Sequence, residues 1–280
     1  MKKIILSIIA FAAFAVSCDD FIEKDTRGVQ SIDNYFQTAQ ECENYVNELT
    51  HRLLLPNDWW TLIAPRVTNE MATDDAWMGN TGQDNSAHRP SSQYTITPDN
   101  MGDMNSSYTA HYYTIQSCNL GLEKMAESPI SESQKNQYMG ESLFVRAYCY
   151  YELVNNFGAV PLYTKSLGTS DLKLERSPVA TVYAQIEADL LESAAKLEST
   201  PVARNGRVNK WAAYALLARV SLFQEKWTEA KQYSNKVITE GPFALEANFL
   251  NIWNVNNHNG VESILEAQSS SVQDKSLGSM

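Results

Sequence analysis

The chain has 280 residues and a formal net charge of −11, with 44% hydrophobic and 20% charged residues. This composition is typical of a globular protein and excludes a disordered chain. The acidic balance repels phosphate backbones and anionic lipid head groups, so it argues against nucleic acid as a partner.

The first segment is a hydrophobic run that stops at a cysteine. Lys2 and Lys3 precede the mostly apolar stretch Ile4–Val16, and Asp19 and Asp20 follow Cys18. The run is shorter than the roughly 20 residues that a spanning helix needs. A basic start, a short apolar run and small residues before a cleavage point are typical of an export signal.

The stretch Ala15-Val16-Ser17-Cys18 resembles a bacterial lipobox, in which the cysteine becomes the first residue and is acylated. The lipobox pattern prefers Leu where this chain has Ala15. We expect a lipoprotein signal peptide over residues 1–17, a lipidated tether over 18–30 and one domain over 31–280. An ordinary secretory signal that merely ends near Cys18 is the alternative.

Residues 31–55 predict a helix. Apolar residues recur there at helical spacing, namely Ile32, Tyr35 or Phe36, Ala39, Cys42, Val46, Leu49 and Leu53. Ser31 or Asp33 is expected to cap the start of this helix, and Pro56 follows its end.

Residues 56–108 show no sustained periodicity and are interrupted by proline and glycine. A structureless connection of this length is uncommon in a compact domain and is usually functional or disordered. Trp59, Trp60 and Trp77 lie in it, whereas disordered segments are poor in aromatic residues. We therefore predict an ordered loop region that carries function.

Helical periodicity returns over residues 109–127, 131–157 and 177–200. Gly158 is predicted to end the second of these helices, and Val160-Pro161 to force an extended chain after it. Ser177 is expected to be the N-cap of the third helix.

Residues 207–240 predict a pair of antiparallel helices. The small residues Ala218 and Ala230 and then Pro242 follow one another at intervals of twelve, and Trp227 stands just before the second helix. This spacing is typical of a tetratricopeptide helix–turn–helix. Trp211 and Trp227 are expected to pack between the helices. The predicted fold class is mainly α, a tetratricopeptide-like helical repeat scaffold with long irregular ligand-binding loops.

Cys42, Cys118 and Cys149 are widely spaced and odd in number once Cys18 is set aside. They form neither a disulfide framework nor a zinc site pattern. We expect them to be small buried apolar residues.

The stretch GESLFVRAYCYYELVNNFGAVPLYT (140–164) resembles the signature of the SusD-like, or RagB/SusD, family. Gly140-Glu141, Arg146-Ala147, an aromatic-rich helix and Gly158 to Leu162 occur in the family's order. We expect this signature to be structural, with Arg146 paired inside the helical bundle.

This resemblance implies a surface-exposed, lipid-anchored protein of the cell outer membrane. Such a protein binds a nutrient, a glycan or a peptide, and docks as a lid on a SusC-like TonB-dependent transporter, without a cofactor and without chemistry of its own. Family members are longer than this chain, so the sequence is expected to be an N-terminal portion; a compact relative is the alternative.

Catalytic patterns are missing from the sequence. It has no Gly-x-Ser-x-Gly elbow, no P-loop and no glycine-rich dinucleotide turn, and its histidines lack a metal-ligand spacing. We expect no enzyme and no bound metal. Two other functions stay open, a periplasmic tetratricopeptide-type scaffold that binds proteins and a lipid-anchored hydrolase.

The stretch TNEMATDDAWMGNTGQDN (68–85) is the predicted ligand-binding region. Sugars present apolar ring faces, which aromatic side chains cover, and hydroxyl edges, which carboxylates and amides bind. The stretch supplies both kinds of group, namely Trp77, Asp74, Asp75, Asn80, Gln83 and Asn85. Some family members place a glycan-stacking tryptophan in this early loop region. The alternative is that Trp77 packs the loop onto the bundle.

Overall fold

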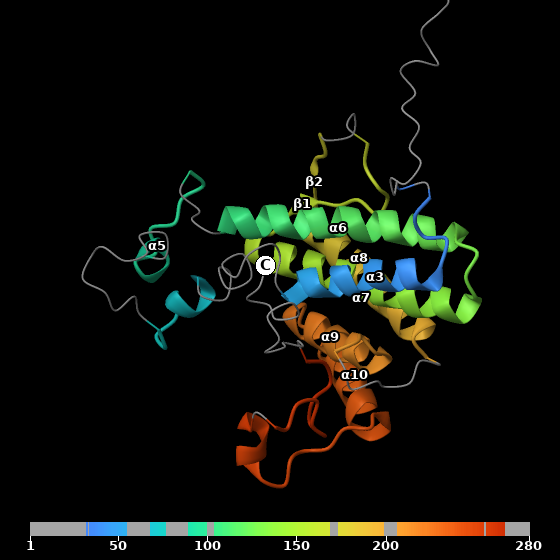
Figure 1. Cartoon of the computed structure of the whole chain (residues 1–280). Helices are drawn as coiled ribbons and strands as arrows, with labels where there is room; N and C mark the ends of the chain where they lie inside the picture. Colours follow the sequence, from blue (N-terminus) through green and yellow to red (C-terminus); the bar gives the residue numbers. More distant parts are fainter. Residues whose placement is uncertain are drawn as a thin grey trace, which may run out of the picture. The chain divides into compact units, whose positions relative to one another are not determined.

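The protein is mainly helical, as predicted (Figure 1). The computed structural model describes residues 32, 34–54, 68–76, 89–99, 104–168, 173–198, 206–254 and 256–266. The α-helices are α3 (Ala39–Leu54), α5 (Arg89–Ser92), α6 (Met104–Glu127), α7 (Glu132–Phe157), α8 (Val179–Lys196), α9 (Lys210–Phe223) and α10 (Trp227–Glu240). The other elements are β1 (Val160–Pro161), β2 (Arg176–Ser177) and the 3₁₀-helix η1 (Phe249–Trp253). No helix within these ranges is both long enough and apolar enough to cross a membrane.

Consecutive helices from α6 to α10 pack against one another, and α3 packs against α6 and α7 (Figure 1). The helix α7 lies at the centre of this stack, and Val145, Tyr150 and Leu153 on it are fully buried. Each helix thus buries an apolar face against its neighbour in sequence, which is the packing of tetratricopeptide-like repeats.

Both ends of α7 follow the local signals in the sequence. The Ser131 side chain accepts a hydrogen bond from the Gln134 backbone N–H, and the Gln134 side chain accepts one from the Ser131 backbone, which together form a capping box. Gly158 ends the helix with a φ of 70° and donates its N–H to the Val154 carbonyl. The prediction that Gly158 terminates this helix is confirmed, because a positive φ favours glycine.

The start of α3 differs from the prediction. The helix begins at Ala39 and not near residue 31, and Ile32 is exposed. Thr38 Oγ1 accepts from the Glu41 N–H, while Glu41 Oε2 accepts from the Thr38 N–H. This reciprocal pair caps the helix at Thr38, and Phe36 just before it has a positive φ of 68°.

The start of α8 also differs. Ser177 lies in β2, which pairs antiparallel with β1 so that Val160 faces Ser177 and Pro161 faces Arg176. The helix begins at Val179, and its cap residue Pro178 makes no side-chain hydrogen bond. The prediction of Ser177 as N-cap was wrong, because Ser177 belongs to β2 and pairs with Val160 of β1.

The helices α9 and α10 form the predicted antiparallel pair. Trp211 is buried in it, but 62% of Trp227 is exposed, so the prediction that Trp227 packs between helices was wrong. Ala230 and Val237 define the buried face of α10. Trp227 is the first residue of the helix and is exposed to solvent there.

Cys42, Cys118 and Cys149 are all buried and free, which confirms their expected role as small interior residues.

Candidate functional site

The predicted loop site is described only in part. Asp74 and Asp75 lie in a turn after a helical segment at 68–71, and both are exposed. Thr73 Oγ1 fixes this turn, because it donates to the Glu70 carbonyl and accepts from the Asp75 N–H. Trp77, Asn80, Gln83 and Asn85 lie outside the described residues, as does Cys18.

A second surface is fully described, and it starts from the polar face of α6. Gln116, Asn119 and Glu123 are spaced by three and four residues, so their side chains lie along one side of the helix. Each binds the backbone of the extended segment 163–167. This segment belongs to no helix or strand, so the side chains of α6 supply the hydrogen bonds that regular secondary structure would otherwise provide. Gln116 Nε2 donates to the Leu167 carbonyl at 3.2 Å, and its Oε1 accepts from the Leu167 N–H at 3.0 Å.

Asn119 and Glu123 continue this attachment. Asn119 Nδ2 donates to the carbonyls of Tyr163 and Lys165 at 3.3 and 3.0 Å. Glu123 Oε1 accepts from the Ser166 N–H at 2.8 Å, and its Oε2 from the Ser166 hydroxyl. The segment 163–167 is therefore held in one conformation along α6.

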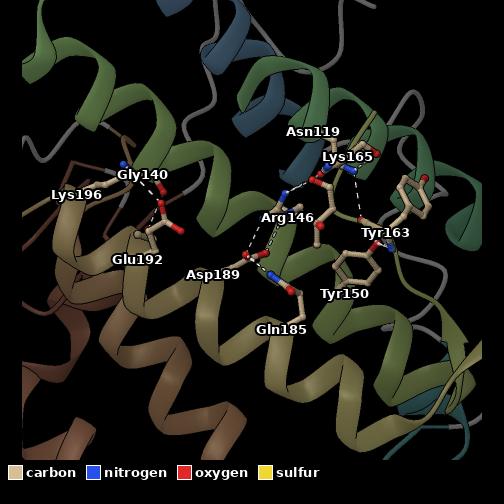
Figure 2. A network of polar contacts seen from close by, with 12 residues as sticks. Asn119, Gly140, Arg146, Tyr150, Tyr163, Lys165, Gln185, Asp189, Glu192 and Lys196 are labelled. Carbon is tan, nitrogen blue, oxygen red and sulfur yellow. Dashed lines mark hydrogen bonds and ion pairs between the residues drawn. The ribbon is translucent and has the colours of Figure 1, made fainter. Parts of the chain in front are cut away.

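A buried ion pair anchors this arrangement from below (Figure 2). The Arg146 guanidinium on α7 donates two hydrogen bonds to the Asp189 carboxylate on α8, at 2.8 and 2.7 Å. Its Nη1 donates to Asn119 Oδ1 at 2.8 Å, which orients the Asn119 amide toward the segment. Gln185 Nε2 donates to Asp189 Oδ1 at 2.7 Å. Three helices and the extended segment thus share one polar network.

The charge states in this network follow from burial and pairing. Burial opposes the positive charge of Arg146, but the hydrogen bonds and the charge of Asp189 outweigh burial, so the pKa of Arg146 is raised. Arg146 therefore stays charged and requires its carboxylate partner.

Tyr163 is fixed twice over. Its backbone N–H donates to the Tyr150 hydroxyl at 2.9 Å, and that hydroxyl donates to the Tyr163 carbonyl at 2.7 Å (Figure 2). Its own hydroxyl donates to the Tyr112 carbonyl at 3.3 Å. Burial raises the pKa of Tyr163 to about 12, so the phenol stays neutral at physiological pH.

Four tyrosines line a pocket of about 430 Å³ beside this segment. We call it the tyrosine pocket, and its aromatic residues are Tyr108, Tyr112, Tyr113 and Tyr163. The other lining residues are uncharged, namely Thr109, Gln116, Leu167 and Gly168. Its volume lies in the range of about 300–1,000 Å³ that is usual for small-molecule sites.

The rings of the pocket are packed in a defined geometry. Tyr112 and Tyr163 stack with ring centroids 5.9 Å apart and an interplanar angle of 15°. The ring centroid of Tyr108 lies 4.8 Å from that of Tyr112 and 5.0 Å from that of Phe157, which it meets edge-to-face. Tyr113 differs from these rings, because 62% of it is exposed. The pocket therefore combines a rigid aromatic wall with one open ring.

Sequence reasoning did not identify this pocket. The helical spacing of Tyr108, Tyr112 and Gln116 was visible in the sequence, but aromatic residues at such spacing are usually core residues. Tyr163 comes from a different element, and no sequence pattern reports that Gln116 holds the chain near it. The prediction that Arg146 pairs inside the bundle, in contrast, is confirmed.

The stacked helices define a tetratricopeptide-like helical scaffold, and the buried Arg146–Asp189 pair lies within the predicted signature stretch 140–164 and the helix that packs on it. This chain belongs to the SusD-like family, because the family model described as "Starch-binding associating with outer membrane" matches residues 24–222.

Particular relatives support this assignment. SusD-like protein P25 of Formosa agariphila is 26% identical over 277 residues, which cover 93% of this chain and 50% of the relative. SusD-like protein P2 of the same organism is 25% identical, covering 95% of this chain and 52% of the relative. The chain therefore spans about half the length of these curated relatives.

Solved structures agree with the fold. A laminarin-binding SusD-like protein superposes with a TM-score of 0.75 at 27% identity, covering 85% of this chain and 53% of that protein. NanU of B. fragilis superposes with a TM-score of 0.73 at 23% identity, covering 88% of this chain and 51% of that protein. The second similarity concerns the fold alone.

Proposed function

We propose that this protein captures a glycan at the cell surface and delivers it to a TonB-dependent transporter of the outer membrane. In this proposal it is anchored by a lipid on Cys18, binds its ligand without a cofactor and carries out no reaction. The observation that carries the proposal is the family match over residues 24–222. The similarity to a laminarin-binding protein, at 27% identity, supports a glycan over a peptide.

The proposed ligand contacts in the loop region are Trp77, Asp74, Asp75, Asn80 and Gln83. The two carboxylates are exposed in the turn that leads into Trp77, which leaves them accessible to sugar hydroxyls. A carboxylate accepts hydrogen bonds from hydroxyls, whereas a side-chain amide both donates and accepts them. A tryptophan ring would cover the apolar face of a sugar.

Isothermal titration of the full chain against a glycan panel tests binding, and analysis of the panel for released products tests whether the protein is a hydrolase. We expect binding of at least one glycan and no products. Protein-binding activity without any glycan binding would favour a periplasmic scaffold instead.

Substitution of Trp77 by alanine tests the loop site. We expect glycan affinity to fall by about 1–3 kcal/mol, as at other aromatic stacking sites, while the melting temperature changes little. The exposed Trp253, 73% of which is accessible, provides a matched control as Trp253→Ala. A loss of about 3–5 kcal/mol of unfolding free energy in Trp77→Ala would instead identify Trp77 as a core residue.

The anchor and the transporter are tested in cells. Metabolic labelling with a fatty-acid analogue should mark the wild type but not Cys18→Ser, because thioether acylation requires the sulfur. Protease treatment of intact cells should degrade a surface protein and spare a periplasmic one. Affinity isolation of the wild-type protein from the outer membrane should also recover the transporter. If no transporter is recovered, the proposal that the protein acts as a lid on it is contradicted.

A further inference from the structure

The tyrosine pocket is separate in sequence from the loop residues to which the glycan role was assigned. We propose that it is an additional subsite, which takes one uncharged pyranose ring of the glycan. The ligand class rests on the proposed function, while the location and the charge selectivity rest on the geometry below.

The lining of the tyrosine pocket is uncharged. None of the eight residues that line the pocket is charged. An anionic sugar bound there would lose its hydration without gaining a cationic partner, and the net charge of −11 would add repulsion. Sulfated or uronic acid units are therefore disfavoured, and neutral sugars are not.

The aromatic wall of the pocket is preorganised. The Tyr112 hydroxyl donates to the Pro161 carbonyl at 2.7 Å, and the Tyr163 hydroxyl donates to the Tyr112 carbonyl. Both rings are thus held by backbone contacts before any ligand arrives. A ligand that covers rigid rings does not have to immobilise them, so less side-chain entropy is lost on binding.

The groups that line the pocket match the two kinds of surface on a pyranose. One face of such a ring is apolar and can lie on the exposed Tyr113 ring, while its rim carries hydroxyl groups. Gln116 donates only one of its two amide N–H groups to Leu167, which leaves the other for a sugar oxygen. Thr109 Oγ1 donates to the Asn105 carbonyl and keeps its acceptor capacity for a sugar hydroxyl. The pocket therefore places an aromatic ring for the apolar face of the sugar beside polar groups for its hydroxyl rim.

The test uses the full chain and isothermal titration with neutral hexasaccharides of a β-1,3-glucan, an α-1,4-glucan and a β-1,4-mannan, together with an oligogalacturonate as the anionic probe. For a neutral glycan that binds the wild type, Tyr113→Ala should weaken affinity by about 5- to 160-fold, the range for loss of an aromatic stacking partner. Tyr113→Phe should retain most of the affinity, because it keeps the ring face. Trp253→Ala removes an exposed aromatic side chain outside the pocket and should have no effect.

A second variant and a direct readout distinguish the loss of a ligand contact from a loss of folded protein. Thr109 is exposed on α6, so Thr109→Arg should obstruct the pocket without disturbing the core. In protein with ¹³C-labelled tyrosine rings, the bound glycan should shift the resonances of Tyr112, Tyr113 and Tyr163.

The outcomes separate the two proposals. Binding that is unaffected by Tyr113→Ala and Thr109→Arg, without shifts of these tyrosine resonances, would overturn the subsite and leave the glycan function in place. Absence of binding by any glycan would overturn both. Tyr113-dependent binding of the oligogalacturonate would overturn the selectivity for uncharged sugars.

Discussion

Arg146 is the residue on which the interior polar contacts converge. It contacts Asp189, Asn119 and the Thr164 carbonyl, and through Asn119 it supports the segment that borders the tyrosine pocket. Within the family signature its role is therefore to connect helix packing with the position of a surface segment.

Substitution of Arg146 by methionine should cost about 3–5 kcal/mol of unfolding free energy, because it leaves the buried Asp189 carboxylate without its partner. Only 7% of the Arg146 side chain and 2% of the Asp189 side chain are exposed, so water cannot replace the lost contacts. Chemical denaturation measures the change.

The double variant Arg146→Met/Asp189→Leu is the control for this prediction. It removes both charges together and should recover much of the lost stability. If the single variant were as stable as the wild type, the ion pair could not be the anchor of this network.

His111 predicts a pH dependence of stability. Burial lowers the pKa of this imidazole, against the opposing effects of the Ser107 backbone and the Glu152 charge. Its Nδ1 lies 2.7 Å from the Ser107 carbonyl oxygen, which can only accept, so the ring donates there. In the unfolded chain the ring binds a proton near pH 6.5, whereas in the folded protein it stays neutral to lower pH.

The unfolded state therefore binds more protons just below pH 6.5, and the free energy of unfolding should fall as pH decreases through this window. The replacement His111→Gln should make that fall shallower between pH 7 and 5.5, as measured by urea denaturation. Equal slopes in the two proteins would show that His111 does not titrate differently on folding.

At the scale of elements, the contact between α7 and α8 depends on a small residue. A Cβ atom added at Gly140 would lie 2.8 Å from Leu197 Cγ and 3.2 Å from Lys196 Cβ. The Ser193 hydroxyl donates to the Gly140 carbonyl at 2.7 Å at the same contact (Figure 2 shows Gly140). Close approach of the two helices is therefore fixed by Gly140.

Gly140→Ala should destabilise the protein by up to about 2 kcal/mol, because overpacking at this contact costs about 1–3 kcal/mol while alanine gains only about 1 kcal/mol over glycine in a helix. Thermal denaturation measures the effect. The double variant Gly140→Ala/Leu197→Ala relieves the clash and should not suffer the overpacking penalty, although it loses the buried leucine. A stabilised single variant would contradict the close contact.

The elements that sequence predicted well are those with local causes. The capping box at Ser131 and the left-handed turn at Gly158 lie within a few residues of the helix ends that they define. The start of α8 was misplaced because Ser177 pairs with Val160, a residue far from it in sequence. The tyrosine pocket was missed for the same reason, since it requires Tyr163 to lie beside α6.

At the scale of the whole molecule, burial is uneven along the chain. On α7, Val145, Tyr150 and Leu153 are fully buried, whereas after α10 Leu245 is 84% and Trp253 73% exposed. Apolar side chains that no described residue covers contribute little to local stability.

Amides of residues 247–254, which are exposed, should therefore exchange with solvent much faster than those of α7, because local opening there disrupts few buried contacts. Hydrogen exchange followed by mass spectrometry measures the difference. Equal protection of both regions would mean that residues 247–254 are as firmly packed as the central helix.

The buried thiols of Cys118 on α6 and Cys149 on α7 report whether these two helices are packed together. Burial raises the pKa of Cys118 to about 12 and that of Cys149 well above its usual value, so neither forms the reactive thiolate while the helices stay together. Only a chain whose helices have separated can be alkylated or cross-linked there. Under oxidising conditions the packing of α6 on α7 therefore keeps both sulfurs away from oxidants, whereas separation of these helices exposes two thiols that are able to form disulfides.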